Sequence, residues 1–259
     1  MSGPATATAA ARPAPTPGAP LVVLIHGVGL GPRSLRALSL ALAQRSAPVL
    51  VFTRRGYGRR AHLPPPTTVT EHVDDLLTEL EARTVELPVL VGVSGGATVA
   101  LEAALTHHSR VLVAVAHEPA AGSLAPELRN RIRQALDDAG GVGLVRFLVG
   151  EATWARLTPR ERTTIARDQA LIEADARAFA AYEPSLPTAA TDPVPLICAV
   201  GERSGQIRRE VAERLSARTG APIVVVARSA HLPQLDAPAT FAEVIVTQTV
   251  QAVTERSSV

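Results

Sequence analysis

The stretch VGVSGGATVALEAA, residues 91–104, decides the fold, because an apolar run gives way there to a helical pattern across glycines. It contains the pattern Gly-x-Ser-x-Gly, with Ser94 at the centre. In a sharp strand-to-helix turn the serine has a strained backbone, so the residues two before and two after it must be small. Gly92 and Gly96 meet that need. Ser94 is therefore predicted to be a nucleophile at the carboxyl edge of a sheet; the alternative is a polar residue in a structural turn.

Strands and helices are predicted to alternate on both sides of this turn. Apolar β-branched runs predict strands at 21–25, 48–52, 87–93, 110–116, 195–200 and 222–227. Amphipathic spacing predicts helices at 34–44, 70–83, 95–106, 206–218 and 238–254. Thr70 is the expected N-cap of the second helix. Such alternation implies parallel pairing and a sheet covered on both faces, which is an open α/β fold.

The alternation stops between Pro119 and Pro193, where we find no strand pattern. Helical pieces are predicted there at 126–139, 143–149, 153–157 and 159–182. The first twenty residues are rich in Ala, Pro and Thr and are expected to be disordered. The predicted organisation is a tail at 1–20, an α/β core at 21–119 and 191–259, and a helical cap at 120–190 over one end of the sheet.

Composition limits the kinds of partner. The net charge is +2, and the 26 basic residues are all arginine and scattered, so nothing predicts nucleic-acid binding. No segment has about 18 consecutive apolar residues, so no membrane span is expected. The single cysteine, Cys198, excludes an intramolecular disulfide and fits a reducing, cytoplasmic location. The expected partner is a small-molecule substrate.

Other kinds of site fail on spacing. His26-Gly27-Val28-Gly29 and Pro32 do not complete Gly-x-Gly-x-x-Gly, and the next strand ends without an acidic residue for a ribose. A Walker-type phosphate loop is excluded because Gly-Lys-Ser/Thr is absent. His117-Glu118 has no second histidine at His-Glu-x-x-His spacing, so no metal site is predicted. No cofactor is expected.

Four short motifs occur in the order and spacing of one known fold family: His26-Gly27, Arg55-Gly56-Tyr57-Gly58, the Ser94 pentapeptide, and Ala230-His231-Leu232-Pro233. In these motifs residues 21–254 resemble the α/β-hydrolase fold superfamily. The resemblance implies a serine, acid and histidine triad in that chain order, with Ser94 as nucleophile and His231 as general base. It also implies an oxyanion hole from the backbone N–H groups of Val28 and Gly95, whose side chains would be nearly free to vary.

The acid of the implied triad departs from the family pattern. Most relatives carry an aspartate three residues after the glycine that ends the strand preceding the final strand, and here Ser204 has that position. A serine cannot supply the negative charge that stabilises imidazolium. A known variation takes the carboxylate from the end of the preceding central strand, where this chain has Glu118. Glu118 is the predicted acid, with Glu202 and Asp192 as alternatives.

The resemblance implies a cap-bearing serine hydrolase acting on an ester, lactone or thioester of a small apolar substrate. The alternatives are non-hydrolytic chemistry on the same fold, such as cofactor-free oxygenation, C–C cleavage or cyclisation, and a non-catalytic ligand-binding protein. Side chains expected to line an apolar pocket, unless they only pack the cap onto the sheet, are His26, Trp154, Phe147, Tyr182, Leu148 and Phe179.

A second departure concerns the edge of the sheet. Most relatives have an antiparallel hairpin before the strand that leads to His26-Gly27, whereas only a proline-rich tail precedes Leu21 here. A shortened, mostly parallel sheet of about six strands is therefore expected, with one edge uncovered. A homodimer is the predicted way of covering that edge.

Overall fold

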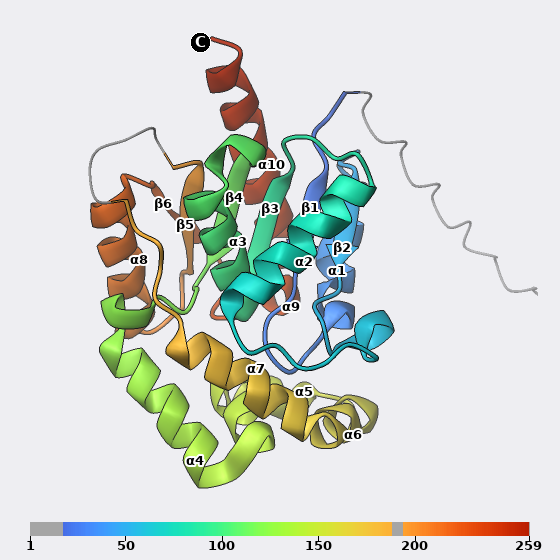
Figure 1. Ribbon diagram of the computed structural model, residues 1–259, viewed down its shortest axis with the longest axis vertical. Coiled ribbons are helices and arrows are strands. Elements are labelled where there is room, and N and C mark those ends of the chain that lie inside the picture. Colours follow the sequence, from blue (N-terminus) through green and yellow to red (C-terminus); the bar gives the residue numbers. More distant parts are fainter. Residues whose placement is uncertain (1–17, 188–193, 259) are drawn as a thin grey trace, which may run out of the picture.

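The computed structural model describes residues 18–187 and 194–258. Its centre is a six-stranded sheet in which all neighbouring strands are parallel, in the order β2-β1-β3-β4-β5-β6 (Figure 1). The strands are β1 (Val22–Ile25), β2 (Val49–Phe52), β3 (Val89–Val93), β4 (Val113–His117), β5 (Leu196–Gly201) and β6 (Ile223–Val226). The predicted α/β fold is confirmed. Residues 1–17 of the expected tail and the candidate acid Asp192 lie outside the described residues.

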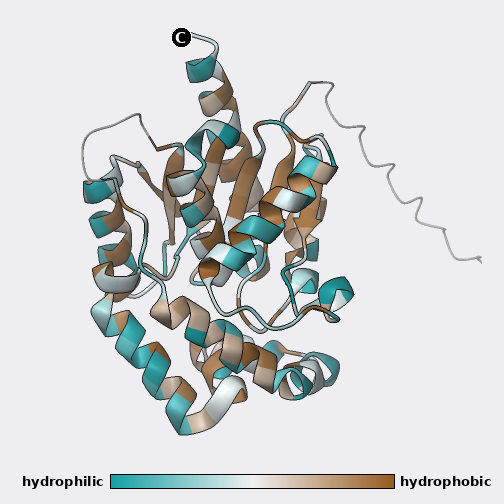
Figure 2. Cartoon of the chain, in the orientation of Figure 1, coloured by the Kyte–Doolittle hydropathy of each residue, from teal (hydrophilic) through white to brown (hydrophobic). Residues whose placement is uncertain are grey.

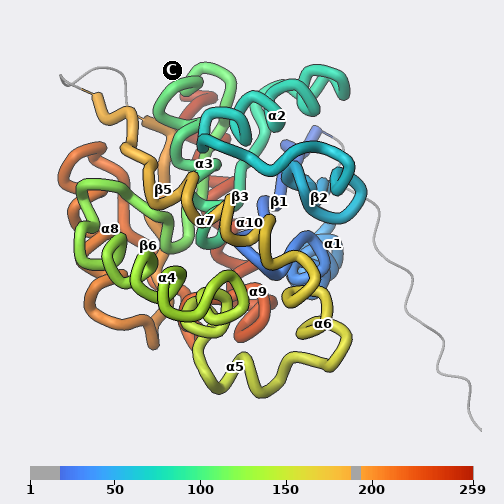
Figure 3. Tube along the Cα trace, turned by 60° about the horizontal axis from the view of Figure 1, so that its bottom comes forward, coloured from blue at the N-terminus to red at the C-terminus, as the bar shows by residue number. Residues whose placement is uncertain are grey.

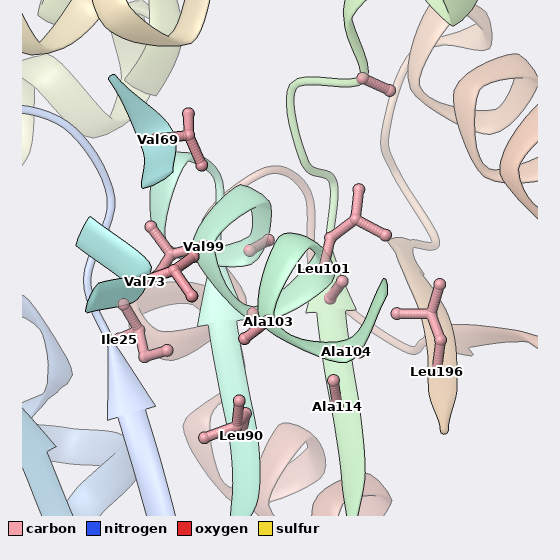
Figure 4. Close-up of a cluster of buried hydrophobic side chains, with 14 of the residues drawn as sticks. Ile25, Val69, Val73, Leu90, Val99, Leu101, Ala103, Ala104, Ala114 and Leu196 are labelled. Atoms are coloured by element: carbon pink, nitrogen blue, oxygen red, sulfur yellow. The ribbon is translucent and has the colours of Figure 1, made fainter. Parts of the chain in front are cut away.

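Helices cover both faces of the sheet because strand side chains alternate between the two faces. The face of Ile25 and Leu90 is covered by α2, α3 and α8, and the face of Leu24 and Val91 by α1 and α10. The bounds are α1 (Arg36–Ala43), α2 (Val69–Ala82), α3 (Gly95–Thr106), α8 (Gln206–Thr219) and α10 (Pro238–Arg256). Figure 4 shows part of the first cluster, with side chains of α2 and α3 against the strands.

Hydropathy follows this arrangement. The central strands are hydrophobic along their length, as parallel strands covered on both faces must be, while the covering helices are mixed (Figure 2). Every residue of β1, β3, β4 and β5 is buried, whereas the two edge strands β2 and β6 are partly exposed.

The homodimer expected at an uncovered edge stays a prediction. In the described part of the chain no helix has the length and apolar character needed to cross a membrane.

The start of α2 differs from the sequence prediction. Thr68 is the N-cap: its hydroxyl accepts the Glu71 N–H at 3.2 Å, and the Glu71 carboxylate accepts the Thr68 N–H at 3.3 Å. This reciprocal pair is a capping box. The prediction of Thr70 as N-cap is wrong because the Thr68–Glu71 pair satisfies two N–H groups at once, two residues earlier.

Four helices between β4 and β5 are called the cap helices below. They are α4 (Pro126–Val149), α5 (Glu151–Arg156), α6 (Pro159–Arg167) and α7 (Gln169–Ala181). α4 is kinked at Gly140, which has φ 61°, and this explains why the sequence pattern falls into two pieces there. The single helix predicted at 159–182 is divided in two at Asp168, whose ψ of 15° interrupts the helix. The bounds of a separate cap domain stay a prediction.

The cap helices lie together beside one end of the sheet (Figures 1 and 3). This is the carboxyl end of the strands, because the loop that follows β1 packs against them. In that loop Val28 and Leu30 contact an apolar cluster formed by Val145 of α4, Ile165 of α6 and Ile172 of α7. The edge where the sequence predicts a site is therefore enclosed between the sheet and the cap helices.

Candidate active site

Ser94 stands in the sharp turn between β3 and α3. Its backbone has φ 56° and ψ −123°, a strained conformation for a residue with a side chain. A Cβ on Gly92 would lie 2.1 Å from the Gly96 carbonyl oxygen, and a Cβ on Gly96 would lie 2.1 Å from the Ile25 carbonyl oxygen. Both neighbours must be glycine for the turn to form, and the expected strand-to-helix turn is present.

Glu118 and His231 meet at the same edge of the sheet. Glu118 directly follows β4 with a strained φ of 52°, and His231 precedes α9 (Pro233–Asp236). The Nδ1–H of His231 donates to Glu118 Oε2 at 2.8 Å. Of the alternative acids, Glu202 is exposed and its carboxylate accepts the Arg228 N–H at 2.7 Å instead. The structure thus brings together the predicted base and the predicted carboxylate.

Ser204 explains how a carboxylate from β4 fits here. Its hydroxyl donates to Glu118 Oε1, and the Gly201 N–H donates to the same oxygen at 3.0 Å. The other oxygen, Oε2, is left for His231. The position where most relatives carry the acid therefore supplies a hydrogen-bond donor to an acid that comes from the neighbouring strand.

The surroundings set the charges of this pair. Burial raises the pKa of Glu118, but the hydrogen bond from His231 and the charge of the Arg208 guanidinium hold it well below its ordinary value. Burial, followed by the Arg208 guanidinium, lowers the pKa of His231 despite the opposing effect of Glu118. At neutral pH the pair is an ionised carboxylate and a neutral imidazole that can accept a proton.

His117, the last residue of β4, contacts both sides of the site. Its carbonyl accepts the Ser94 N–H at 2.9 Å, and its Nε2–H donates to the carbonyl of Ala230, the neighbour of His231, at 3.1 Å. Burial lowers its pKa to about 4, so the ring is neutral. In the sequence His117 is a candidate only for metal binding; the signal that it belongs to this site is its position at a predicted strand end, next to Glu118.

Val28 and Gly95, the residues of the two predicted oxyanion donors, lie against each other. A Cβ on Gly27 would be 3.1 Å from Ser94 Cβ, so the loop carrying Val28 runs past the serine. A Cβ on Gly95 would be 3.1 Å from Val28 Cγ2 and 2.7 Å from the Phe179 ring. Within the described chain neither N–H has a hydrogen-bond acceptor. The expectation that the side chain at 95 is nearly free to vary is wrong, because Phe179 occupies that space.

Ser94 and His231 line one small cavity of about 10 Å³, room for about one water molecule. Its lining consists of Gly27, Val28, Leu30, Ser34, Ser94, Leu148, Val149, His231, Leu232 and Gln234. In this structure the Ser94 hydroxyl and His231 Nε2 are not hydrogen-bonded to each other, and Nε2 has no partner among the described residues. Catalytic hydrogen bonds are often long before substrate binds.

Most side chains expected to line a pocket lie elsewhere. Phe147 is 44% exposed, and the Arg162 guanidinium lies over the Trp154 ring. Tyr182 donates its hydroxyl to Glu102 at 2.7 Å, and His26 is fully buried. None of these four side chains lines the cavity beside Ser94, whereas Leu148, named with them, does. Which side chains contact a substrate stays a prediction.

A larger groove of about 490 Å³ adjoins the small cavity. It lies between the loop after β1, the turn at Tyr57 and α6, and it shares Leu30 and Ser34 with the cavity beside Ser94. No group of three or more His, Cys, Asp or Glu side chains suited to a metal ion occurs in the described residues.

Comparisons with known proteins agree with this architecture. The structure is similar to an esterase from Thermogutta terrifontis (22% identity, TM-score 0.69, 92% of each chain). It is also similar to the enol-lactonase from Burkholderia xenovorans (18% identity, TM-score 0.62, 92% of this chain and 94% of that one) and to the type II thioesterase BorB from the borrelidin biosynthetic cluster (20% identity, TM-score 0.64, 92% and 94%). At these identities the likeness shows the fold. No curated protein matches the chain in sequence.

The family follows from a match along most of the chain. Residues 22–244 match the model of the alpha/beta hydrolase family, and this range includes Ser94, Glu118 and His231. With its six parallel strands and covering helices, the chain belongs to the α/β hydrolase family.

Proposed function

We propose that this protein is a serine hydrolase that cleaves an ester, lactone or thioester through an acyl-enzyme. The observation that carries the proposal is the 2.8 Å hydrogen bond from His231 Nδ1 to Glu118, beside a cavity that His231 shares with Ser94. A carboxylate that accepts the Nδ1–H hydrogen bond fixes the tautomer in which Nε2 can accept a proton. A strained serine and an oriented base at one cavity are the parts that acyl transfer requires.

In the proposed mechanism Ser94 Oγ attacks the substrate carbonyl carbon while His231 Nε2 takes the hydroxyl proton. Glu118 stabilises the imidazolium that forms. The N–H groups of Val28 and Gly95 stabilise the negative oxygen of the tetrahedral intermediate. His231 then gives its proton to the leaving group, and a water activated by His231 releases the acid and restores Ser94.

The lining of the cavity favours a small apolar acyl group, because Val28, Leu30, Leu148, Val149 and Leu232 surround Ser94 and His231. A cavity of about 10 Å³ does not hold such a group. Substrate binding therefore requires the α4 side chains in this lining to move, and the adjoining groove can hold the remainder of the molecule. Esterase, lactonase and thioesterase are the activities named for the similar structures.

A serine at 204 in place of the acid would favour non-hydrolytic chemistry only if His231 had no carboxylate, and Glu118 supplies one. No specific observation favours oxygenation, C–C cleavage, cyclisation or ligand binding alone.

We predict that kcat/KM for ester hydrolysis depends on a single group that must be deprotonated. His231 is required in its neutral form, and burial lowers its pKa below the ordinary value near 6.5. Activity should therefore fall only as pH drops below about 6.5 and should be constant through neutral pH. The measurement is the pH profile of kcat/KM on a p-nitrophenyl ester of a short fatty acid.

A buffer-matched thermal melt at each pH separates protonation from unfolding. An acidic limb centred above pH 7 with the fold intact would contradict the assignment of a buried, neutral His231 as base. No hydrolysis of short oxygen esters, lactones or thioesters above the background rate would overturn the proposed function itself.

A further inference from the structure

A fully buried ion pair joins the core to the cap helices. Arg54, two residues after β2, donates through Nη1 and Nη2 to the two carboxylate oxygens of Asp175 in α7, each at 2.7 Å. Both side chains are 0% exposed. Burying two charges costs several kcal/mol per ion, so such a pair contributes little net stability. A role beyond stability must be sought in what else the two side chains contact.

The remaining donors of Arg54 reach the loop that carries the proposed oxyanion donor Val28. Nε donates to the His26 carbonyl at 3.0 Å, and Nη2 donates to the Gly27 carbonyl at 2.9 Å. The His26 ring adds a second donor to Gly27, through Nδ1–H at 2.9 Å, while its Nε2 accepts the Arg54 backbone N–H at 3.2 Å. The Gly27 carbonyl is thereby held from two sides.

Holding the Gly27 carbonyl also fixes the Val28 N–H. The two groups belong to one planar trans peptide, in which C=O and N–H point in opposite directions. An N–H directed toward the oxyanion therefore requires the Gly27 oxygen to point away, where Arg54 and His26 receive it. Rotation of this peptide would remove the donor and break both hydrogen bonds.

Gly29, which follows Val28, is also linked by hydrogen bonds to the Asp175 carboxylate. The Gly29 N–H donates to the Tyr57 hydroxyl at 3.2 Å, and that hydroxyl donates to Asp175 Oδ2 at 2.7 Å. Asp175 lies within α7, and its Oδ1 is also in contact with His72 Nε2 at 3.0 Å. Both neighbours of Val28 are thus tied through one intermediate side chain to Asp175.

From these contacts we infer that Asp175 and Arg54 are positioning residues of the oxyanion hole. The inference rests on the proposed acyl-transfer function. Asp175 acts from α7 through Arg54 and Tyr57, and touches neither substrate nor Ser94. One consequence is that the Val28 N–H keeps its productive direction only while α7 is packed on the core, so docking of the cap helices and stabilisation of the oxyanion are linked.

The test compares Asp175→Asn with a matched control, Glu102→Gln. Glu102 is also a buried carboxylate that ties the core to the end of the cap helices, through the Tyr182 hydroxyl at 2.7 Å and the hydroxyl of Ser185, but it does not contact the loop. For each variant kcat and KM are measured on an oxygen ester and on the matching thionoester. The sulfur of a thionoester is a poor hydrogen-bond acceptor, so its turnover depends weakly on the oxyanion hole.

We expect Asp175→Asn to lower kcat on the oxygen ester about 10- to 100-fold, with a small change in KM, and to lower thionoester turnover less than about threefold. The ester-to-thionoester rate ratio then falls, whereas Glu102→Gln leaves the ratio at the parent value. If Asp175→Asn fails to fold, Tyr57→Phe removes only the bonds to Gly29 and Asp175 and should lower the ratio by a smaller factor.

An unchanged ratio in an active, folded Asp175→Asn or Tyr57→Phe variant would overturn the positioning role and leave the proposed function standing. A ratio lowered equally by Glu102→Gln would also overturn it, since any loosening of the cap helices would then suffice. A parent protein without esterase activity would overturn the proposed function and this inference with it.

Discussion

Replacement of Ser94 by alanine lowers kcat/KM for ester hydrolysis by at least about 10⁴-fold, because it removes the proposed attacking hydroxyl, and the Ser34 hydroxyl in the same lining donates to the Gly31 carbonyl instead. The turn itself should persist, since its shape depends on Gly92 and Gly96 and on the Ser94 N–H bond to the His117 carbonyl, none of which alanine removes. The measurement is kcat/KM for parent and variant on one activated ester, with thermal melts showing equal stability.

Ser185→Ala is the matched control. It removes a serine hydroxyl that donates to the buried Glu102 carboxylate, far along the chain from the proposed triad. The kcat/KM of Ser185→Ala should stay within about threefold of the parent, because this hydroxyl is not part of the proposed triad and its loss should have only a small effect on stability. A Ser94→Ala variant that retains activity within about tenfold of the parent would exclude an acyl-serine.

The second large effect is expected at Glu118. Glu118→Gln keeps the size of the side chain but removes the charge that holds the His231 tautomer and stabilises its protonated form, so kcat should fall about 10³- to 10⁴-fold. Loss of the carboxylate also removes an influence that raises the pKa of His231, so the residual acidic limb should move to lower pH. Both are read from one pH profile of the variant.

The neighbouring Ser204 offers a sharper version of this experiment. Because its hydroxyl contacts Glu118 Oε1, an aspartate at 204 would bring a carboxylate close to the space that Glu118 fills. The double variant Glu118→Ala/Ser204→Asp should have at least about tenfold higher kcat than the single variant Glu118→Ala. Ser204→Ala alone, which keeps the carboxylate, should cost about tenfold or less. Near-normal turnover by Glu118→Gln would remove Glu118 from the triad.

The fold and the central turn could be predicted because their signals are local. The period of the strands and helices and the glycines around Ser94 follow from short-range sterics, and the structure has the expected sheet. The meeting of Glu118 with His231 was predictable only through a family pattern and remained one of three choices, because a hydrogen bond between residues 113 positions apart leaves no local signal.

The side chains that hold the loop after β1 were not predicted. Arg54 and Asp175 are 121 positions apart, and a charged residue in an amphipathic helix is ordinarily solvated. Only the packing of α7 shows that Asp175 faces inward. The contacts of Tyr182 and Trp154 were not predicted for a related reason: large rings favour burial, but burial alone does not say which space they fill.

The most direct measurement of the proposed chemistry is covalent labelling of the folded protein with a small fluorophosphonate, followed by intact mass and peptide mapping. The account predicts one adduct per chain on Ser94, no adduct in Ser94→Ala, and loss of esterase activity in proportion to labelling. Slow labelling is expected, since the cavity beside Ser94 is about 10 Å³ until the cap side chains move. A parent that hydrolyses esters but carries no adduct on Ser94 after complete inactivation would contradict the account.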